Sequence, residues 1–246
     1  MKKITLLLLL TFLVTLTRGQ DRNTYKQRLY STYIGEQMHQ WKGIISEMNQ
    51  EYERTSNPVL LYDLCFAYYG YIGYLLSKEE EKEAKEALKT AMRKSDILEE
   101  RLPGRADVLA LQGAFLGYRI VLSKFSSMFL GPKAFKYINT AYESSSTCFN
   151  CNVEMGNMKF YTPKFLGGSK TEAIQYYEKG VALLENSKLK TERDWIYMNT
   201  VLLLANAYVD TGQQERACKL YEHLLKYEPK ADWIRRDLYL KKCQKQ

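Results

Sequence analysis

Apolar residues recur at helical spacing along most of this chain, and polar residues occupy the positions between them. Near the carboxyl end, Ala217, Tyr221 and Leu224 lie four and then three residues apart, so they share one face of a helix predicted over 213–226. The small side chain of Ala217 allows a second helix to approach closely. The pattern therefore predicts a helix that packs against a partner.

The partner is the apolar segment that comes just before it. Leu204 and Tyr208 form a matching apolar face, and Thr211-Gly212 supplies the turn between the two helices. Pro229 ends the pair, because a proline disfavours the helical conformation of the residue before it. The two segments predict a hairpin of antiparallel helices.

The same spacing occurs three times upstream, each time after a longer apolar helix: Ala84, Leu88 and Ala91; Ala134, Ile138 and Ala141; and Ala173, Tyr177 and Gly180. We therefore predict four helical hairpins. Ahead of them a single long helix is expected, because helical spacing continues without a break through Tyr30, Ile34, Met38, Trp41, Ile45, Met48 and Tyr52. Asn57 is expected to cap the next helix, with Pro58 as its first residue. The sequence shows no strand-like alternation of useful length.

In sequence, the last hairpin runs Val201-x-x-Leu204-Ala205-x-x-Tyr208, then Gly212, Ala217-x-x-x-Tyr221 and Pro229. It resembles a tetratricopeptide repeat (TPR), whose pattern is Trp-x-x-Leu-Gly-x-x-Tyr, Ala-x-x-x-Phe and a closing Pro. Val201 in place of Trp is the main departure. The resemblance implies an all-α fold, a right-handed α-solenoid of about four TPR-like helical hairpins with an N-terminal helix and a C-terminal capping helix. Residues 185–193 read as a polar loop inserted between the last two repeats.

The first residues have the pattern of a cleaved signal peptide. Two lysines precede a mostly apolar run over 4–16, and small residues lie at the two positions that a signal peptidase recognises. A helix of that length rises only about 20 Å, short of the roughly 30 Å hydrocarbon core, so stable membrane insertion is not expected. We expect cleavage after Gly19: residues 1–19 are the signal peptide, and residues 20–246 form the solenoid domain, periplasmic or secreted.

The charge of the chain argues against nucleic acid as a partner. Removing the signal peptide lowers the net charge from +8 to +5, and basic residues alternate with acids along nearly every helix. Nucleic-acid-binding proteins usually carry a dense basic stripe with interleaved aromatic residues. The run over 78–83, Lys-Glu-Glu-Glu-Lys-Glu, is interpreted as a solvated face at a helix start. The basic tail, with Arg235-Arg236, is interpreted as the polar face of the capping helix.

Five cysteines offer the clearest candidate chemistry. Cys148 and Cys151 have the spacing of a reactive disulfide, but thioredoxin-like enzymes place that pair after a strand in a βαβ unit, so a structural disulfide or free thiols are favoured. Cys218 and Cys243 could pair across the last hairpin and the cap, or Cys218 could be a small buried apolar residue. With only two histidines, no metal site is expected.

Pro163 interrupts the third hairpin, since a proline inside a helix removes a backbone hydrogen bond. The string from Gly156 to Ala173, with Tyr161-x-Pro163 and Phe165-Leu166-Gly167-Gly168-Ser169, resembles the soluble T-components of periplasmic TRAP transporter systems. That resemblance implies a periplasmic helical-repeat protein that meets a solute-binding partner. The alternative is a structural kink capped by serine and glycine.

Candidate binding residues follow from the solenoid, in which the first helix of each hairpin lines the concave side. Asn199, Asn206 and Asp210 are spaced seven and four apart and share one stripe on the last hairpin, and the equivalent stripe of the second hairpin passes Ser123 and Ser127. Asparagine side chains there could hydrogen-bond the backbone of an extended peptide.

Three functional hypotheses follow. The first is an exported, non-catalytic adaptor that binds a protein or peptide partner on its concave face. The second is an accessory subunit of a periplasmic, TRAP-like solute-uptake system. The third is a thiol-disulfide active protein that uses Cys148 and Cys151. No triad, phosphate loop or HExxH motif is present in the sequence, so neither an enzyme nor a cofactor is expected.

Overall fold

The computed structural model describes residues 22–123 and 127–243, and within them it contains helices and turns but no strand. A helix over residues 22–34, called the N-terminal helix, comes first. The elements after it are η1 (Met38–Gln40), α2 (Trp41–Thr55), α3 (Pro58–Ser77), α4 (Glu81–Arg101), α5 (Ala106–Leu122), α6 (Ser127–Ser144), α7 (Phe149–Tyr161), η3 (Lys164–Leu166), α8 (Lys170–Glu185), α9 (Lys188–Thr191), α10 (Trp195–Asp210), α11 (Gln214–Tyr227), η4 (Ile234–Tyr239) and α12 (Leu240–Cys243).

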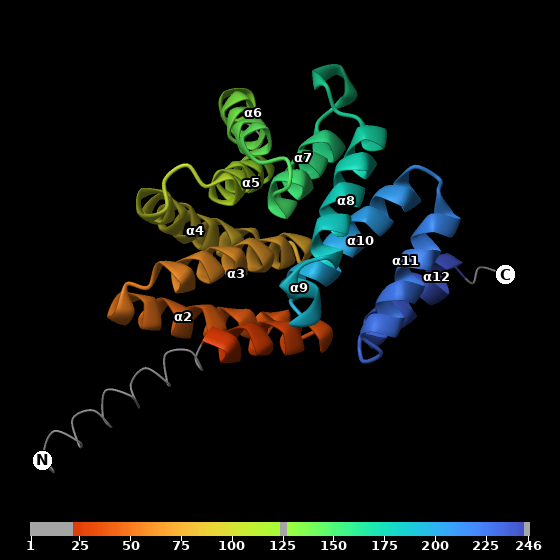
Figure 1. Ribbon diagram of the computed structural model, residues 1–246, viewed down its shortest axis with the longest axis horizontal. Coiled ribbons are helices and arrows are strands. Elements are labelled where there is room, and N and C mark those ends of the chain that lie inside the picture. Colours follow the sequence, from red (N-terminus) through yellow and green to blue (C-terminus); the bar gives the residue numbers. More distant parts are fainter. Residues whose placement is uncertain (1–21, 124–126, 244–246) are drawn as a thin grey trace, which may run out of the picture.

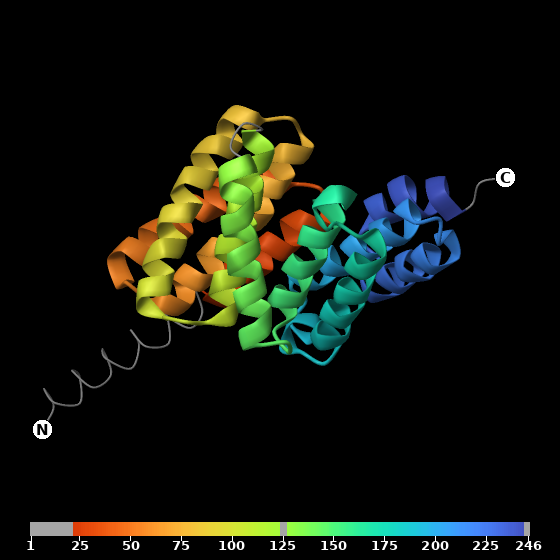
Figure 2. The same ribbon diagram turned by 90° about the horizontal axis from the view of Figure 1, so that it is seen from above.

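The four predicted hairpins are α3–α4, α5–α6, α7–α8 and α10–α11, and they stack in chain order. Each pair packs within itself and against the next, through α4 on α5, α6 on α7 and α8 on α10. Figure 1 shows the hairpins following one another in an arc, and in Figure 2 α11 and α12 lie at the opposite end of the molecule from α4. The all-α solenoid is confirmed.

Local sequence explains where these helices begin and end. Asn57 caps α3 through its side-chain oxygen, which accepts a hydrogen bond from the backbone N–H of Val59 at 2.9 Å, and Pro58 is the first helical residue. The first helix of the third hairpin, α7, ends at Tyr161, two residues before Pro163, and a short 3₁₀ turn over Lys164–Leu166 leads to α8. Gly167 then adopts a φ of 93°, which a residue with a side chain rarely does.

The prediction of one long helix before the first hairpin is wrong. The chain reverses at residues 35–37, where Glu36 has a φ of 58° and the N–H of Gln37 donates to the carbonyl of Thr32 at 2.7 Å. The N-terminal helix and α2 are consequently antiparallel, with the indole N–H of Trp41 donating to the Thr32 hydroxyl at 2.9 Å. Helical spacing persists across the break because both helices present apolar faces to the same core.

This reversal lets the N-terminal helix join the first and last hairpins. Arg22 forms an ion pair with Asp63 of α3, and the Lys26 ammonium lies 3.4 Å from the carboxylate of Asp194, the capping residue of α10. Farther along, the Tyr30 hydroxyl donates to Glu228, just after α11, at 2.9 Å. The two ends of the solenoid therefore share one core.

Tryptophan side chains form the centre of that shared core. The ring of Trp195 lies 5.2 Å from Trp41 and 6.2 Å from Tyr33, measured between centroids. Gly70 of α3 lies directly against both indoles: a Cβ there would stand 2.6 Å from Trp41 and 2.7 Å from Trp195. A glycine is thus required for α3 to approach the two rings.

Two further features complete the fold. Among the described helices, α3 is long and apolar enough to cross a membrane, but 61% of its most apolar window is buried inside the protein, as in the core helix of a soluble domain. At the carboxyl end, a disulfide between Cys218 of α11 and Cys243 of α12 holds the terminal helices on the last hairpin. Cys218 is therefore a disulfide partner rather than a simple apolar residue.

Candidate protein-binding groove

The predicted binding residues of the last hairpin share one face of α10. Asn199 is half-buried, whereas Asn206 and Asp210 are exposed. The carboxylate of Asp210 is already paired, because the ammonium of Lys170 on α8 lies 2.7 Å from it. The asparagine amides are the members of this stripe that remain candidates for a backbone partner.

The two predicted serines belong to a different part of the molecule. Ser123 is exposed and ends α5, and Ser127 begins α6, where its side chain lies outside the described part of the structure. Since α10 packs mainly against α8 and α11, the five predicted residues do not form one cluster. A common site made from all of them is not supported by this geometry.

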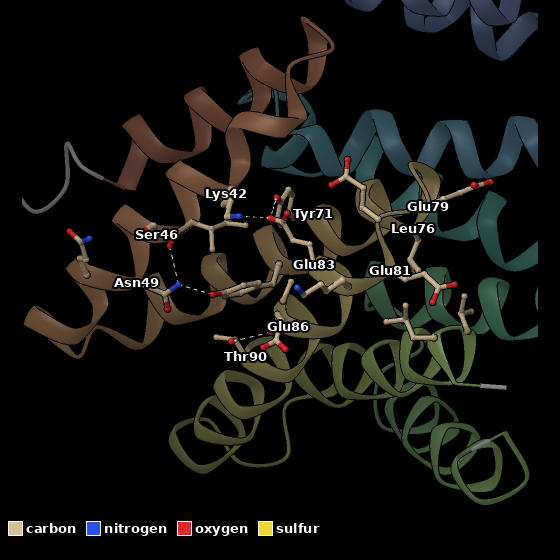
Figure 3. Close-up of a pocket in the computed structure, with 18 of the residues that line it drawn as sticks. Lys42, Ser46, Asn49, Tyr71, Leu76, Glu79, Glu81, Glu83, Glu86 and Thr90 are labelled. Carbon is tan, nitrogen blue, oxygen red and sulfur yellow. Dashed lines mark hydrogen bonds and ion pairs between the residues drawn. The ribbon is translucent and has the colours of Figure 1, made fainter. Parts of the chain in front are cut away.

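The described part of the chain contains a groove of about 1380 Å³. α2 and α4 form its sides, α3 forms its floor, and the end of α5 closes one end (Figure 3). The side chains that line it carry six glutamates against two lysines, although the whole chain has a net charge of +8. We call it the acidic groove.

One end of the acidic groove is held by internal hydrogen bonds. The carboxylate of Glu83 accepts from the Tyr71 hydroxyl at 2.7 Å and lies 3.0 Å from the Lys42 ammonium (Figure 3). The hydrogen bond from Tyr71, helped by the charge of Lys42, lowers the pKa of Glu83, whereas burial raises the pKa of Tyr71. Nearby, the Asn49 amide donates to the Tyr68 hydroxyl at 2.8 Å. These contacts link α2, α3 and α4 rigidly.

The other end of the acidic groove is different. Glu79 and Glu80 are exposed there, in the turn that precedes α4, and Glu86 is exposed farther along α4, beside Thr90 (Figure 3); none of the three forms an ion pair with the described residues. Beside them lie the apolar side chains of Leu76, Ala87, Val121 and Leu122, and Val121 is 61% exposed. This end combines uncovered apolar surface with glutamates that have no ion-pair partner among the described residues, although Lys82 also lines the groove.

The sequence pattern alone does not reveal this groove. Residues 78–83 read as a solvated helix start, and Glu81 and Glu83 do occupy the first turn of α4, where acids are stabilised by the helix dipole. Only the packing of α2 and α5 around α3 turns that acidic run into the rim of a hollow. The signal available in the sequence is that glutamates outnumber lysines twofold over residues 78–83.

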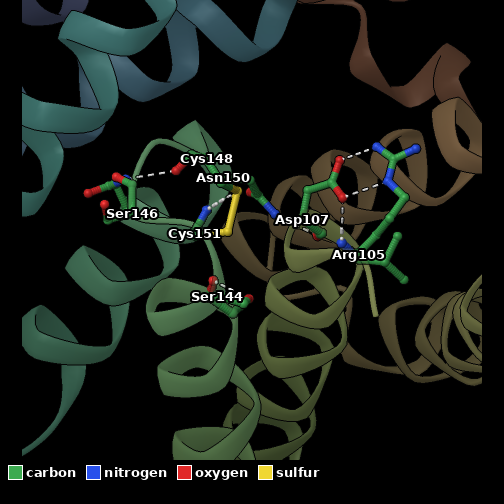
Figure 4. Close-up of a disulfide and its surroundings, with 10 residues drawn as sticks. Arg105, Asp107, Ser144, Ser146, Cys148, Asn150 and Cys151 are labelled. Carbon is green, nitrogen blue, oxygen red and sulfur yellow. Dashed lines mark hydrogen bonds and ion pairs between the residues drawn. A yellow bond between two sulfur atoms is a disulfide. The ribbon is translucent and has the colours of Figure 1, made fainter. Parts of the chain in front are cut away.

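Cys148 and Cys151 form a disulfide at the start of α7 (Figure 4). Cys148 is half-buried and caps the helix, its sulfur accepting from the N–H of Cys151 at 3.1 Å. Cys151 is fully buried between Ala110 and Ala141. A buried thiolate is a poor leaving group in disulfide exchange, so this environment suits a structural bridge better than a reactive one.

Comparison with known proteins agrees with this architecture. The family model of the tetratricopeptide repeat matches residues 200–230. A thermophilic TPR protein from Thermus thermophilus is structurally similar, with a TM-score of 0.60 and 13% identity, over 90% of this chain and 98% of that one. The HusA haemophore from Porphyromonas gingivalis is also similar, with a TM-score of 0.53 and 14% identity, over 76% of this chain and 94% of that one. No curated protein matches the sequence.

These findings show a tetratricopeptide repeat at residues 200–230 and a TPR-like helical-repeat fold. Proteins built from stacked hairpins present extended surfaces to other macromolecules.

Proposed function

We propose that this protein is an exported, non-catalytic adaptor that binds a segment of a protein partner in the acidic groove. The observation that carries the proposal is the groove itself, about 1380 Å³ in volume and open between α2 and α4. Grooves between helices are a common way to bind a peptide or an amphipathic helix, with apolar anchors supplying the affinity. The signal-peptide pattern of residues 1–19 supports export.

The stripe on α10 is the competing surface for the same function. Asn199 and Asn206 could hydrogen-bond an extended peptide, as the sequence predicts, and they lie on the far hairpin from the acidic groove. A solute-binding partner of a TRAP-like system, or any other exported protein partner, would bind at one of these two surfaces. The experiment therefore has to compare the two positions directly.

Site-specific photo-crosslinking in the native cell tests the proposal. A photoreactive amino acid is placed at Ser46 or Thr90, which line the acidic groove, at Asn206 on α10, or at the exposed Lys219 of α11 as a control. We expect the groove positions to capture one defined partner in the exported fraction, because only a bound segment lies within reach of their side chains. Capture of the partner from Asn206 alone would show that it binds at the α10 stripe and not in the acidic groove. No capture at either surface would contradict an adaptor role.

A second candidate function is haem binding, which the fold likeness to a haemophore suggests. The observation that favours it is an exposed apolar cluster on the turn after α7, where Tyr161, Phe165 and Leu166 are 71%, 86% and 59% exposed. Lys164, next to Phe165, could pair with a carboxylate of the porphyrin.

Titration with haem, followed by its absorption spectrum, tests this candidate. Binding predicts a saturable spectral change that Phe165→Ala together with Leu166→Ala removes, because the exposed apolar contact is lost. The exposed Val59→Ala substitution, far along the chain on α3, serves as the control and should leave the titration unchanged. A spectrum that stays that of free haem at every protein concentration rules out haem carriage.

A further inference from the structure

We propose that the partner segment in the acidic groove is amphipathic and positively charged, with apolar side chains that contact Leu76, Ala87 and Val121 and with lysines or arginines that pair with Glu79, Glu80 and Glu86. This inference rests on the proposed function and names the chemistry of its partner. It follows from the uneven distribution of charge pairing along the groove.

Charge pairing divides the glutamates of the acidic groove into two sets. Glu53 and Glu83 are each paired with a lysine, Lys94 and Lys42, so their charge is already compensated. Glu79, Glu80 and Glu86 have no such partner among the described residues, although 36 lysines and arginines are distributed over the chain. Carboxylates without an ion-pair partner, Glu79 and Glu80 at one end of the groove and Glu86 farther along α4, attract a cationic side chain and repel an acidic one.

Apolar surface at the same end determines the rest of the partner. Leu76 and Ala87 are half-buried, Val121 is mostly exposed, and Leu122 lies beside it at the end of α5. Covering this surface releases water and supplies the affinity that exposed ion pairs alone do not give. A purely polar basic segment would leave it uncovered, so the fitting partner carries apolar side chains next to its positive charges.

The geometry of the walls favours a helical partner. α2 and α4 contain 15 and 21 residues, and both pack on α3, so the groove between them is long and bounded by helices. An amphipathic helix places its apolar residues on one face and its lysines beside them. This arrangement matches the acidic groove, in which apolar side chains lie next to glutamates.

Binding of two synthetic peptides by the purified protein tests the inference. Both are helices of about 18 residues, or roughly 27 Å, with the same leucine face, and their polar faces carry either lysine or glutamate. Fluorescence anisotropy of labelled peptide measures each affinity. We expect the lysine peptide to bind and to weaken as salt rises from about 0.05 to about 0.5 M, because exposed charges are screened over that range. The glutamate peptide should not bind.

Charge-neutralised variants assign the effect to the groove. The triple variant Glu79→Gln, Glu80→Gln and Glu86→Gln should bind the lysine peptide about tenfold more weakly, since each exposed pair contributes a fraction of a kcal/mol. A matched control neutralises three exposed glutamates outside the groove: Glu100→Gln, Glu143→Gln and Glu192→Gln. The control should retain the affinity of the original protein, and circular dichroism checks that both variants remain helical.

Other outcomes separate this inference from the proposed function. If both peptides bind alike and Val121→Ser weakens both, the groove recognises apolar side chains without charge preference, and the proposed function stands while the inference fails. If neither peptide binds, the inference about the partner's charge fails, whichever protein is crosslinked to the groove in cells. If no protein is crosslinked either, the proposed adaptor function is rejected as well. Self-association that the triple variant abolishes would make a second copy of the chain the occupant and would also overturn the inference.

Discussion

Trp195→Ala is expected to lower the free energy of unfolding by about 3 to 5 kcal/mol, as large-to-small substitutions of buried aromatic residues do. Trp195 is 5% exposed at the start of α10, and its ring packs against Trp41 and Tyr33. Gly70 provides no side chain that could move into the space left behind. The cavity would therefore stay largely unfilled.

The same substitution should loosen one region more than the others. Trp195 is one of the contacts through which the N-terminal helix and α2 share a core with the last hairpin, and its ring packs on both Tyr33 and Trp41. Without it, we expect amide hydrogen exchange to rise first in residues 22–55, while α5 to α8 keep their protection, because local contacts set local opening. Exchange that rises evenly along the chain would contradict the role of this core in joining the two ends.

Urea unfolding measures the stability loss, and an exposed apolar residue provides its control. Leu166→Ala should change the unfolding free energy by no more than about 0.5 kcal/mol, because Leu166 is 59% exposed. A loss below about 1 kcal/mol for Trp195→Ala would mean that the tryptophan cluster is not packed as described.

Glu154→Gln is expected to remove a pH dependence of stability worth about 3 kcal/mol, because burial raises the pKa of Glu154 to about 7 from its ordinary 4.5. Glu154 lies on α7 with only 2% of its surface exposed. One carboxyl oxygen accepts from the Asn157 amide at 3.0 Å, and the other has no hydrogen-bond partner. Asn157 and Tyr69 lower the pKa, but burial has the larger effect.

The sign of the effect follows from proton binding. Between pH 4.5 and about 7 the folded protein keeps the proton on Glu154, whereas the unfolded chain releases it. The contribution of this group to stability is therefore fully present below pH 4.5 and is lost as the pH rises through the folded pKa. Glutamine does not ionise, so the variant should gain stability relative to the original protein as the pH rises from 5 to 8.

Unfolding free energies of both proteins at pH 5, 6, 7 and 8 check this prediction. The difference between them should change by about 2 to 3 kcal/mol across the series, in favour of the variant at high pH. Glu143→Gln removes an exposed carboxylate on α6 and should give a profile parallel to that of the original protein. Parallel profiles for Glu154→Gln would show that Glu154 does not hold its proton in the folded state.

The hairpins could be predicted because the information that specifies them is local. Ala217, Tyr221 and Leu224 are all fully buried on α11, as their spacing indicates. Helical periodicity reports which face of a segment is covered, and short turns fix the pairing of consecutive helices. Proline and capping residues such as Asn57 then place the boundaries.

The break in the N-terminal helix could not be predicted in the same way. Helical spacing continues across the break through Ile34, Met38 and Trp41, so the apolar pattern does not indicate that the helix ends there. The reversal depends on contacts of Tyr30 and Tyr33 with residues nearly 200 positions away, among them Glu228 and Trp233. Such contacts leave no periodic trace in the sequence.

The sequence by itself determined the four hairpins and their order, because each depends on residues within one or two helical turns. The tertiary structure alone decided that the N-terminal helix joins the first and last hairpins, and that the glutamates of residues 79–86 rim a groove rather than a plain solvated face. Both features depend on which helices meet across long stretches of chain. A periodic pattern of neighbouring residues does not specify contacts between helices that are far apart in the sequence.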